Sequence, residues 1–373
     1  MGINTKNLFP RIKARLPRRR KMEVRTVAVC AAQVPFFQGG AEAHVQGLVR
    51  SLGTRGYEVD LINLPYKWYP HEQLLKSIRI WQMIDLTESN GKRIDMVIAT
   101  KFPSYFIDHP NKVLWLIHQY RQAYDLLHTP YSGFAPESKK DMKLRQELVD
   151  MDTAALMSYR RIYTNAGNTA MRLKKYNGVN GEPLYHPPRL AGRYRTGVYG
   201  NYILSVGRLD PLKRVDLLIK SLRHCRRELV CRIAGMGPER ERLEALAREA
   251  GITERVEFLG YVSDEELLSL YAGCSAVFFA PLDEDYGYVT LEAFLSKKPV
   301  VTTYDSGGPL EFVKHEENGI VLDSLDEKDI AKGIEKMFFD KAKCRKYGES
   351  GYEAVKDISW DHVIDTLIPG RNP

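Results

Sequence analysis

The sequence predicts an α/β protein made of two successive domains, each built on a doubly wound parallel sheet. Its 373 residues are enough for two domains of ordinary size, each with its own core. Short apolar runs alternate with longer amphipathic stretches along most of the chain, which is typical of parallel strands joined by helices. The alternation is interrupted from Glu182 to Asn201, a segment that is rich in Pro, Gly and Arg. We therefore expect the linker between the domains there.

The composition is that of a soluble globular protein, with 44% hydrophobic and 27% charged residues. No apolar run approaches the roughly 18 residues that a membrane-spanning helix needs. The five cysteines are odd in number and show no paired metal-ligand spacing. They indicate a reducing compartment rather than a disulfide framework or a zinc site, so we expect a cytoplasmic protein.

The net charge of +8 is concentrated at the start of the chain. Residues 1–21 hold eight Lys and Arg and no acid, which leaves 47 bases against 47 acids elsewhere. Leu8, Ile12 and Leu16 recur every four residues, so this tail could lie on the anionic inner face of the cell membrane. The alternative is a disordered, solvated arm. Because neither aromatic interleaving nor a basic face continues into the domains, we expect no nucleic-acid partner.

The first domain is expected over residues 22–190, after the basic tail of residues 1–21. Each short apolar run is interpreted as a buried strand and each longer amphipathic stretch as a helix. The predicted strands are Val24–Ala31, Glu58–Leu64, Ile94–Thr100, Val113–His118 and Arg161–Thr164. The predicted helices are Ala41–Arg55, Gln73–Thr87, Met142–Met157 and Thr169–Tyr176.

The second domain is expected over residues 191–350 on the same pattern. The remaining segment, residues 351–373, is expected to pack back on the first domain around Trp360. The predicted strands are Tyr202–Val206, Leu229–Ala234, Val256–Leu259, Ser275–Ala280 and Val300–Thr303. The predicted helices are Arg214–His224, Glu239–Ala250, Asp264–Ala272, Tyr288–Lys297 and a closing pair within Glu327–Val355.

One stretch of the second domain, Phe279 to Glu292, combines a strand end, an acidic loop, Gly287 and a helix. Such a junction places the free amides of a helix N-terminus at the carboxyl edge of a parallel sheet, where anions bind. Glu284 lies in the loop and Glu292 about one turn into the helix. Two carboxylates on either side of phosphate-binding amides suit the two polyols that flank the diphosphate of a nucleotide sugar. The alternative is an ordinary junction with solvated acids.

Two further loops are expected at the same cleft between the domains. Gly39 and Gly40 follow the first strand, and adjacent glycines let a backbone approach a phosphate or sugar closely. Arg208 and Lys213 follow the first strand of the second domain and could hold two phosphates. Taken alone, the first loop could be a simple tight turn and the second a solvated loop.

Together these motifs resemble the retaining GT-B glycosyltransferases of family four. Glu284 and Glu292 match the E-x7-E motif of that family. The resemblance implies the GT-B fold, in which two Rossmann-like domains face each other, and a nucleotide-sugar donor held mainly by the second domain. It covers about residues 24 to 345 and also includes Gly207-Arg208 with Lys213, Gly39-Gly40-Ala41-Glu42, Gly235-Met236-Gly237 and Ser306-Gly307-Gly308-Pro309.

The resemblance also implies a role for each matched residue. Arg208 and Lys213 would bind the diphosphate, and Glu292 would bind the ribose hydroxyls. Glu284 would contact hydroxyls of the donor sugar, helped by the amides of its loop. The remaining expected donor-binding residues are Gly39, Gly40, Gly235, Gly237, Tyr261, Val262, Tyr286, Gly287, Tyr288, Val289, Thr290 and Leu291, with the Thr290 hydroxyl and the amides beside it on the phosphate next to the sugar.

His118 ends the apolar run VLWLIH, and members of the family have a histidine there that contacts the transferred sugar. The alternative is a histidine that only caps the end of a strand. With His118 included, the expected catalytic residues are His118, Glu284, Arg208 and Lys213.

The expected activity is retaining transfer of a hexose from a UDP- or GDP-linked donor to a glycan or lipid-linked saccharide. The resemblance places it in the assembly of cell-surface polysaccharide or lipopolysaccharide. Two cations and a helix dipole could stabilise the leaving diphosphate, so we expect no metal and no cofactor. Two alternatives remain open: a metal-dependent transferase of the GT-A type that uses Asp283 and Asp285, and a non-catalytic protein that binds sugar nucleotides.

Overall fold

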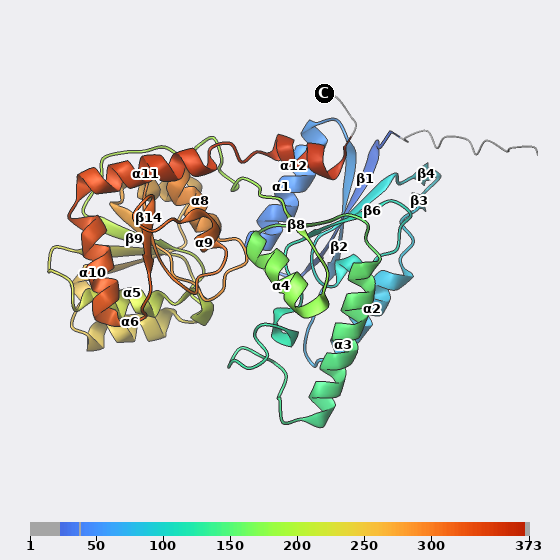
Figure 1. Ribbon diagram of the computed structural model, residues 1–373, viewed down its shortest axis with the longest axis horizontal. Coiled ribbons are helices and arrows are strands. Elements are labelled where there is room, and N and C mark those ends of the chain that lie inside the picture. Colours follow the sequence, from blue (N-terminus) through green and yellow to red (C-terminus); the bar gives the residue numbers. More distant parts are fainter. Residues whose placement is uncertain (1–22, 37–38, 370–373) are drawn as a thin grey trace, which may run out of the picture.

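The computed structural model describes residues 23–36 and 39–369, so the predicted basic tail of residues 1–21 lies outside the described residues. These residues form two α/β domains, each built around a parallel sheet of six strands (Figure 1). Both sheets place the polar loops that follow their strands at their carboxyl edges, which is where doubly wound sheets bind ligands.

The first sheet has the strand order β2-β1-β5-β6-β7-β8, and every pairing within it is parallel. Its central strand β5 is buried along its whole length, because helices cover both faces of the sheet. The strands are β1 (Thr26–Gln33), β2 (Glu58–Pro65), β5 (Met96–Ala99), β6 (Lys112–Leu116), β7 (Ile162–Thr164) and β8 (Glu182–Pro183). The helices are α1 (Gly40–Thr54), α2 (Glu72–Met83), α3 (Lys139–Met157) and α4 (Gly167–Asn177).

The second sheet has the order β11-β10-β9-β12-β13-β14 and is also parallel throughout. The strand order reverses beside β9, so the loops after β9 and β12 leave adjacent strands at the switch point. The strands are β9 (Tyr202–Val206), β10 (Val230–Ala234), β11 (Val256–Gly260), β12 (Ala276–Phe278), β13 (Val300–Thr303) and β14 (Gly319–Leu322). The helices are α5 (Val215–Leu222), α6 (Arg240–Glu249), α7 (Asp264–Gly273), α8 (Tyr288–Leu295), α9 (Pro309–Phe312), α10 (Glu327–Phe338) and α11 (Lys341–Val355).

The chain returns to the first domain at its end. Helix α11 packs against α8 of the second domain, and α12 (Trp360–Leu367) then lies beside α1 of the first domain (Figure 1). Buried Val363, Ile364 and Leu367 join the core cluster of the first domain. Arg55 pairs with Asp361 at 2.8 Å and fixes the outer side of this contact. The two domains are therefore joined both by the linker and by this returning helix.

The alternation of strands and helices predicted the sheets well, but it missed short elements. The hairpin of β3 (Glu88–Ser89) and β4 (Lys92–Arg93), the one-turn helix α9 and the strand β14 were not predicted. Helix α2 ends at Met83 instead of continuing to Thr87. The Asp85 carboxylate accepts hydrogen bonds from the amide and hydroxyl of Thr87 at 2.8 and 2.6 Å, and this side-chain turn replaces the last helical turn.

The described residues contain no helix that is both long and apolar enough to cross a bilayer. All five cysteines are buried with free thiols.

Candidate functional site

Three loops at the carboxyl edge of the second sheet are joined by backbone hydrogen bonds. The Gly207 amide donates to the carbonyl of Ala234 at 3.0 Å, and the Gly235 amide donates to that of Gly260 at 2.8 Å. A Cβ atom at Gly235 would lie 1.8 Å from the Gly207 carbonyl oxygen, and its φ of +146° is rarely adopted by other residues. A Cβ at Gly237 would lie 2.1 Å from the Leu209 carbonyl. Both predicted glycines therefore allow this close approach of the loops.

The two predicted cations lie on the loop after β9. Arg208 is exposed, and Lys213 ends a short turn, Pro211–Lys213, before α5. The Lys213 ammonium forms an ion pair with Glu284, so the structure brings these two predicted residues together. Burial lowers the pKa of Lys213, but the Glu284 carboxylate more than offsets this and the pKa lies above its ordinary value. Lys213 is therefore a fixed positive charge at this edge of the sheet.

Arg214 supports the same edge and was not predicted. Its guanidinium donates to the carbonyls of Ala280 and Pro281, each at 2.8 Å, and pairs with Asp305 at 2.7 Å. It thereby ties the loop after β9 to the loops after β12 and β13. Its backbone is left-handed, with a φ of +47°. A second basic residue directly after Lys213 was the available signal.

The acidic loop continues into α8 as the sequence predicts. Glu284 donates its amide to Ser306 at 2.9 Å and accepts from the Gly308 amide at 2.8 Å, so the loop after β13 holds its backbone on both sides. Gly287 has a left-handed φ of +82° at the start of α8. Thr290 is fully buried and its hydroxyl has no hydrogen-bond partner among the described residues, so a phosphate reaching it would have to enter the first turn of α8.

Glu292 lies one turn into α8 and is partly buried. Its carboxylate accepts a hydrogen bond from the Tyr271 hydroxyl at 2.7 Å. Burial raises the pKa of Glu292, and the hydrogen bond from Tyr271 only partly counters this. The Tyr271 hydroxyl therefore holds the carboxylate in a defined position without neutralising its charge.

The side chains of Tyr286 and Tyr288 point toward the linker. The Tyr286 hydroxyl donates to the His186 carbonyl at 2.6 Å and accepts from the His186 amide at 3.1 Å, while the Tyr288 hydroxyl contacts the His186 ring. The expectation that Tyr286 binds donor therefore applies only to its backbone, because its buried ring joins the domains instead. A Cβ at Gly40 would lie 3.4 Å from the Tyr288 ring, so the glycine loop of the first domain faces the start of α8.

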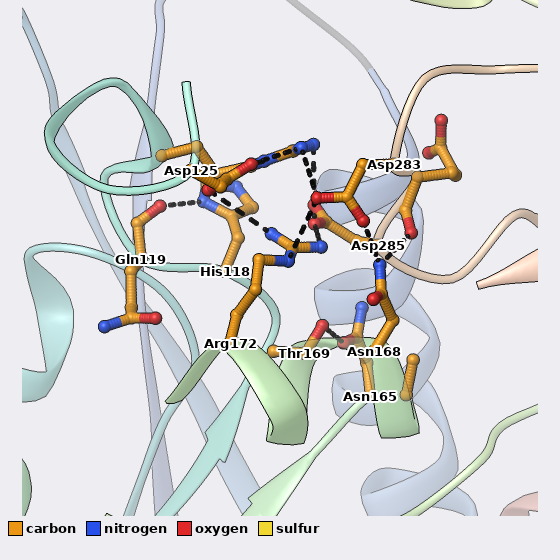
Figure 2. Close-up of polar contacts among 12 residues, drawn as sticks. His118, Gln119, Asp125, Asn165, Asn168, Thr169, Arg172, Asp283 and Asp285 are labelled. Atoms are coloured by element: carbon orange, nitrogen blue, oxygen red, sulfur yellow. Dashed lines mark hydrogen bonds and ion pairs between the residues drawn. The ribbon is translucent and has the colours of Figure 1, made fainter. Parts of the chain in front are cut away.

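His118 follows β6 and is half-buried at the junction between the domains (Figure 2). Its Nδ1 lies 2.9 Å from the carbonyl oxygen of Gln119. Burial lowers the pKa of His118, and the nearby Asp285 carboxylate only partly opposes this. The imidazole is therefore neutral at pH 7 and lies close to the acidic loop of the second domain.

A cluster of charges beside His118 connects the two domains and was not predicted (Figure 2). Arg172 of α4 forms an ion pair with Asp285. Arg121 pairs with Asp125 at 2.6 Å and lies 3.6 Å from Asp285. Burial raises the pKa of Asp285, but the two guanidinium groups outweigh burial and keep the pKa well below its usual range. Asp285 is therefore ionised, and the guanidinium groups of Arg121 and Arg172 in the first domain balance its charge.

The family match of this chain lies in its second domain. Residues 196–354, most of the second domain, match the family model described as glycosyl transferases group 1. An uncharacterized glycosyltransferase of Methanocaldococcus jannaschii is 26% identical over 372 residues, which cover 90% of this chain and 94% of that protein. Residues 196–354 therefore form a domain of the group 1 glycosyl transferases. The resemblance in the sequence is thereby confirmed.

The glycosyltransferase also matches the GDP-mannose-dependent alpha-(1-6)-phosphatidylinositol monomannoside mannosyltransferase of Mycobacterium tuberculosis at 32% identity over 190 residues. That match covers 48% of this chain and 49% of the relative, so it spans about half of each protein.

Solved structures share the fold of the glycosyltransferase. Sucrose-phosphate synthase of Thermosynechococcus elongatus superposes with a TM-score of 0.74 at 17% identity, over 91% of this chain and 97% of that chain. Anabaena HepE in complex with UDP and glucose gives a TM-score of 0.67 at 16% identity, over 91% and 99% of the two chains. The GT-B fold that the resemblance implied is confirmed.

The fold of the glycosyltransferase also bears on the GT-A alternative. That alternative needs Asp283 and Asp285 to hold a metal ion, but Asp285 pairs with Arg172, and Asp283 accepts a hydrogen bond from Asn168 at 2.7 Å. Within residues 23–36 and 39–369, no group of three or more His, Cys, Asp or Glu side chains is arranged to bind a metal. The GT-A alternative is overturned by the confirmed GT-B fold.

Proposed function

We propose that this glycosyltransferase transfers a hexose from a nucleotide-sugar donor with retention of the anomeric configuration. The observation that carries the proposal is the single edge of the second sheet that holds Lys213, Glu284 and the start of α8. A cation, a carboxylate suited to sugar hydroxyls and a helix N-terminus at one edge match the parts of a sugar diphosphate. UDP and glucose bound to HepE, which has the same fold, are consistent with this donor class.

The leaving diphosphate gains negative charge as the sugar departs. Arg208, Lys213 and the N-terminus of α8 supply positive potential at that point, and the protein holds Lys213 and the helix in place in advance. We propose that this arrangement replaces a metal ion. The sequence shows no obvious side-chain nucleophile. We therefore propose that the leaving phosphate itself takes the proton of the acceptor hydroxyl, on the face of the sugar from which the phosphate departs. His118 contacts the donor sugar as a neutral hydrogen-bonding group.

The donor base is proposed to be uracil or guanine. The mannosyltransferase of M. tuberculosis is described as GDP-mannose-dependent, and HepE binds UDP, so both bases occur among similar proteins. A thermal-shift series with UDP, GDP and ADP and their hexose conjugates tests this, since at equal concentration the ligand that binds most tightly raises the melting temperature most. If none of these ligands changes the melting temperature, the proposed donor class is wrong.

The acceptor is proposed to be a glycan or lipid-linked saccharide in cell-surface polysaccharide or lipopolysaccharide assembly, used at the inner face of the membrane. The basic residues 1–21 support this location, because such clusters bind anionic lipid. A protein lacking residues 1–21 should no longer sediment with anionic vesicles but should keep its activity on soluble acceptors. Equal sedimentation of the two proteins would remove the argument for the membrane.

A further inference from the structure

Helix α4 of the first domain begins against the second domain. Its N-cap residue Ala166 provides no side-chain hydrogen bond to the helix. The carboxylate of Glu311, from α9 of the second domain, instead accepts from the amides of Gly167 at 2.8 Å and Asn168 at 2.7 Å. The Tyr185 hydroxyl donates to the same carboxylate at 2.7 Å. Because a carboxylate at a helix N-terminus is stabilising, this cap fixes the helix on the second domain.

One face of α4 holds the loop that carries Glu284. Asn168 and Arg172 are four residues apart, so their side chains lie on the same face. The Asn168 amide group donates to Asp283 at 2.7 Å and to the backbone carbonyl of Glu284 at 2.8 Å. Arg172 forms its ion pair with Asp285 (Figure 2). The residues before and after Glu284, and its own carbonyl, are thus held by the first domain.

These contacts are shielded enough from water to matter energetically. The Arg172 side chain is 9% exposed and that of Asp285 is 19% exposed. Arg121 lies behind them, 3.5 Å from Asp283. Asp283 has a left-handed φ of +45°, which is unfavourable for an aspartate and needs support from its surroundings. The shape of the loop therefore depends on groups of the first domain as well as on the loop after β13.

We propose that Asn168 and Arg172 are positioning residues that set Glu284 against the donor sugar when the first domain docks on the second. This inference rests on the proposed function, in which Glu284 contacts the sugar hydroxyls. The diphosphate and ribose contacts proposed for Arg208, Lys213 and Glu292 belong to the second domain and do not involve α4. Nucleotide binding therefore does not need α4, whereas turnover of the sugar does.

The experiment compares Arg172→Gln, Arg172→Lys and Lys174→Gln. Lys174 is exposed on the same helix, so its substitution removes an equal charge without touching the loop. We expect Arg172→Gln to lower kcat for donor turnover about 100-fold, because small misplacements of reacting groups have effects of this size. The dissociation constant of the nucleoside diphosphate, measured by calorimetry, should stay within about twofold. Arg172→Lys should recover part of the activity, and Lys174→Gln should match the unmodified protein.

A double substitution tests the pathway through Asp285. If Arg172 acts through Asp285, the losses caused by Arg172→Gln and Asp285→Asn should not add in the double variant. Full activity of Arg172→Gln, or an equal loss of nucleotide binding and turnover, would overturn the positioning role. If the unmodified protein turns over no nucleotide sugar, the proposed function itself is wrong. If the unmodified protein is active and Arg172→Gln is equally active, only the positioning role is wrong.

Discussion

Substituting Glu292 by glutamine tests the assignment of the ribose site. The substitution keeps the size of the side chain and can still accept from the Tyr271 hydroxyl, which lies 2.7 Å from the carboxylate. It removes the negative charge and replaces one acceptor oxygen by an NH2 group. We therefore expect the fold to be retained and the affinity for the nucleoside diphosphate to fall.

The size of the effect follows from the environment of the carboxylate. Glu292 is partly buried and oriented by Tyr271, so the bonds proposed from ribose hydroxyls to its carboxylate would be charge-assisted and preorganised. A hydrogen bond to a charged group contributes about 1.5–3 kcal/mol, so its loss should make the dissociation constant roughly 10- to 150-fold larger. Because burial raises the pKa of Glu292, the affinity of the unmodified protein should also fall on acidification at a higher pH than for an ordinary glutamate.

Calorimetric titration with the preferred nucleoside diphosphate and its 2′,3′-dideoxy analogue isolates this contact. The unmodified protein should bind the analogue more weakly, whereas Glu292→Gln should bind both ligands about equally. Glu254→Gln, an exposed substitution in the same domain, serves as the control. If Glu292→Gln still discriminated between the two ligands as strongly as the unmodified protein, the carboxylate would not bind the ribose.

Three other predictions concern the charged groups around the site. His118→Ala should lower turnover at least about tenfold and leave donor affinity unchanged, as measured by single-turnover rates and calorimetry. Because burial lowers the pKa of His118, activity should fall on acidification only below about pH 6.5. A fall that begins above this pH would contradict the role of His118. Lys213→Ala should weaken diphosphate binding about tenfold, and the difference should shrink as salt is raised; a salt-independent difference would contradict a Coulombic contact. Burial lowers the pKa of His44 and lowers that of His186 to about 3, so both histidines bind protons more readily in the unfolded protein. The free energy of unfolding should therefore fall as the pH drops below 6.5, by at most about 1.4 kcal/mol per pH unit for each histidine. Urea titrations from pH 7 to 4 measure this slope, which His186→Gln should reduce, and a flat profile would refute it.

The sequence predicted the two sheets because burial on both faces leaves a clear signal. Strands such as Met96–Ala99 are apolar at every position, and apolar residues recur with a helical period in the helices between the strands. The E-x7-E spacing likewise predicted that Glu284 and Glu292 flank the start of α8, which they do in the structure. These features depend on residues that are close in the chain.

The contacts between the domains could not be predicted in the same way. Arg172 resembles any basic residue of an amphipathic helix, yet it is buried against Asp285, which lies 113 positions further along the chain. Asn168 contacts the same loop from one turn away. No local periodicity records a partner at such a distance. The contact of the Tyr286 ring with His186 could not be predicted for the same reason, because it also crosses between distant segments.

The structure of the protein with its nucleoside diphosphate bound is the most direct test of the proposed donor site. The two phosphates should lie between Arg208 and Lys213 on one side and the first amides of α8 on the other, with the ribose on Glu292. Phosphates bound elsewhere, with these groups facing only solvent or one another, would contradict it.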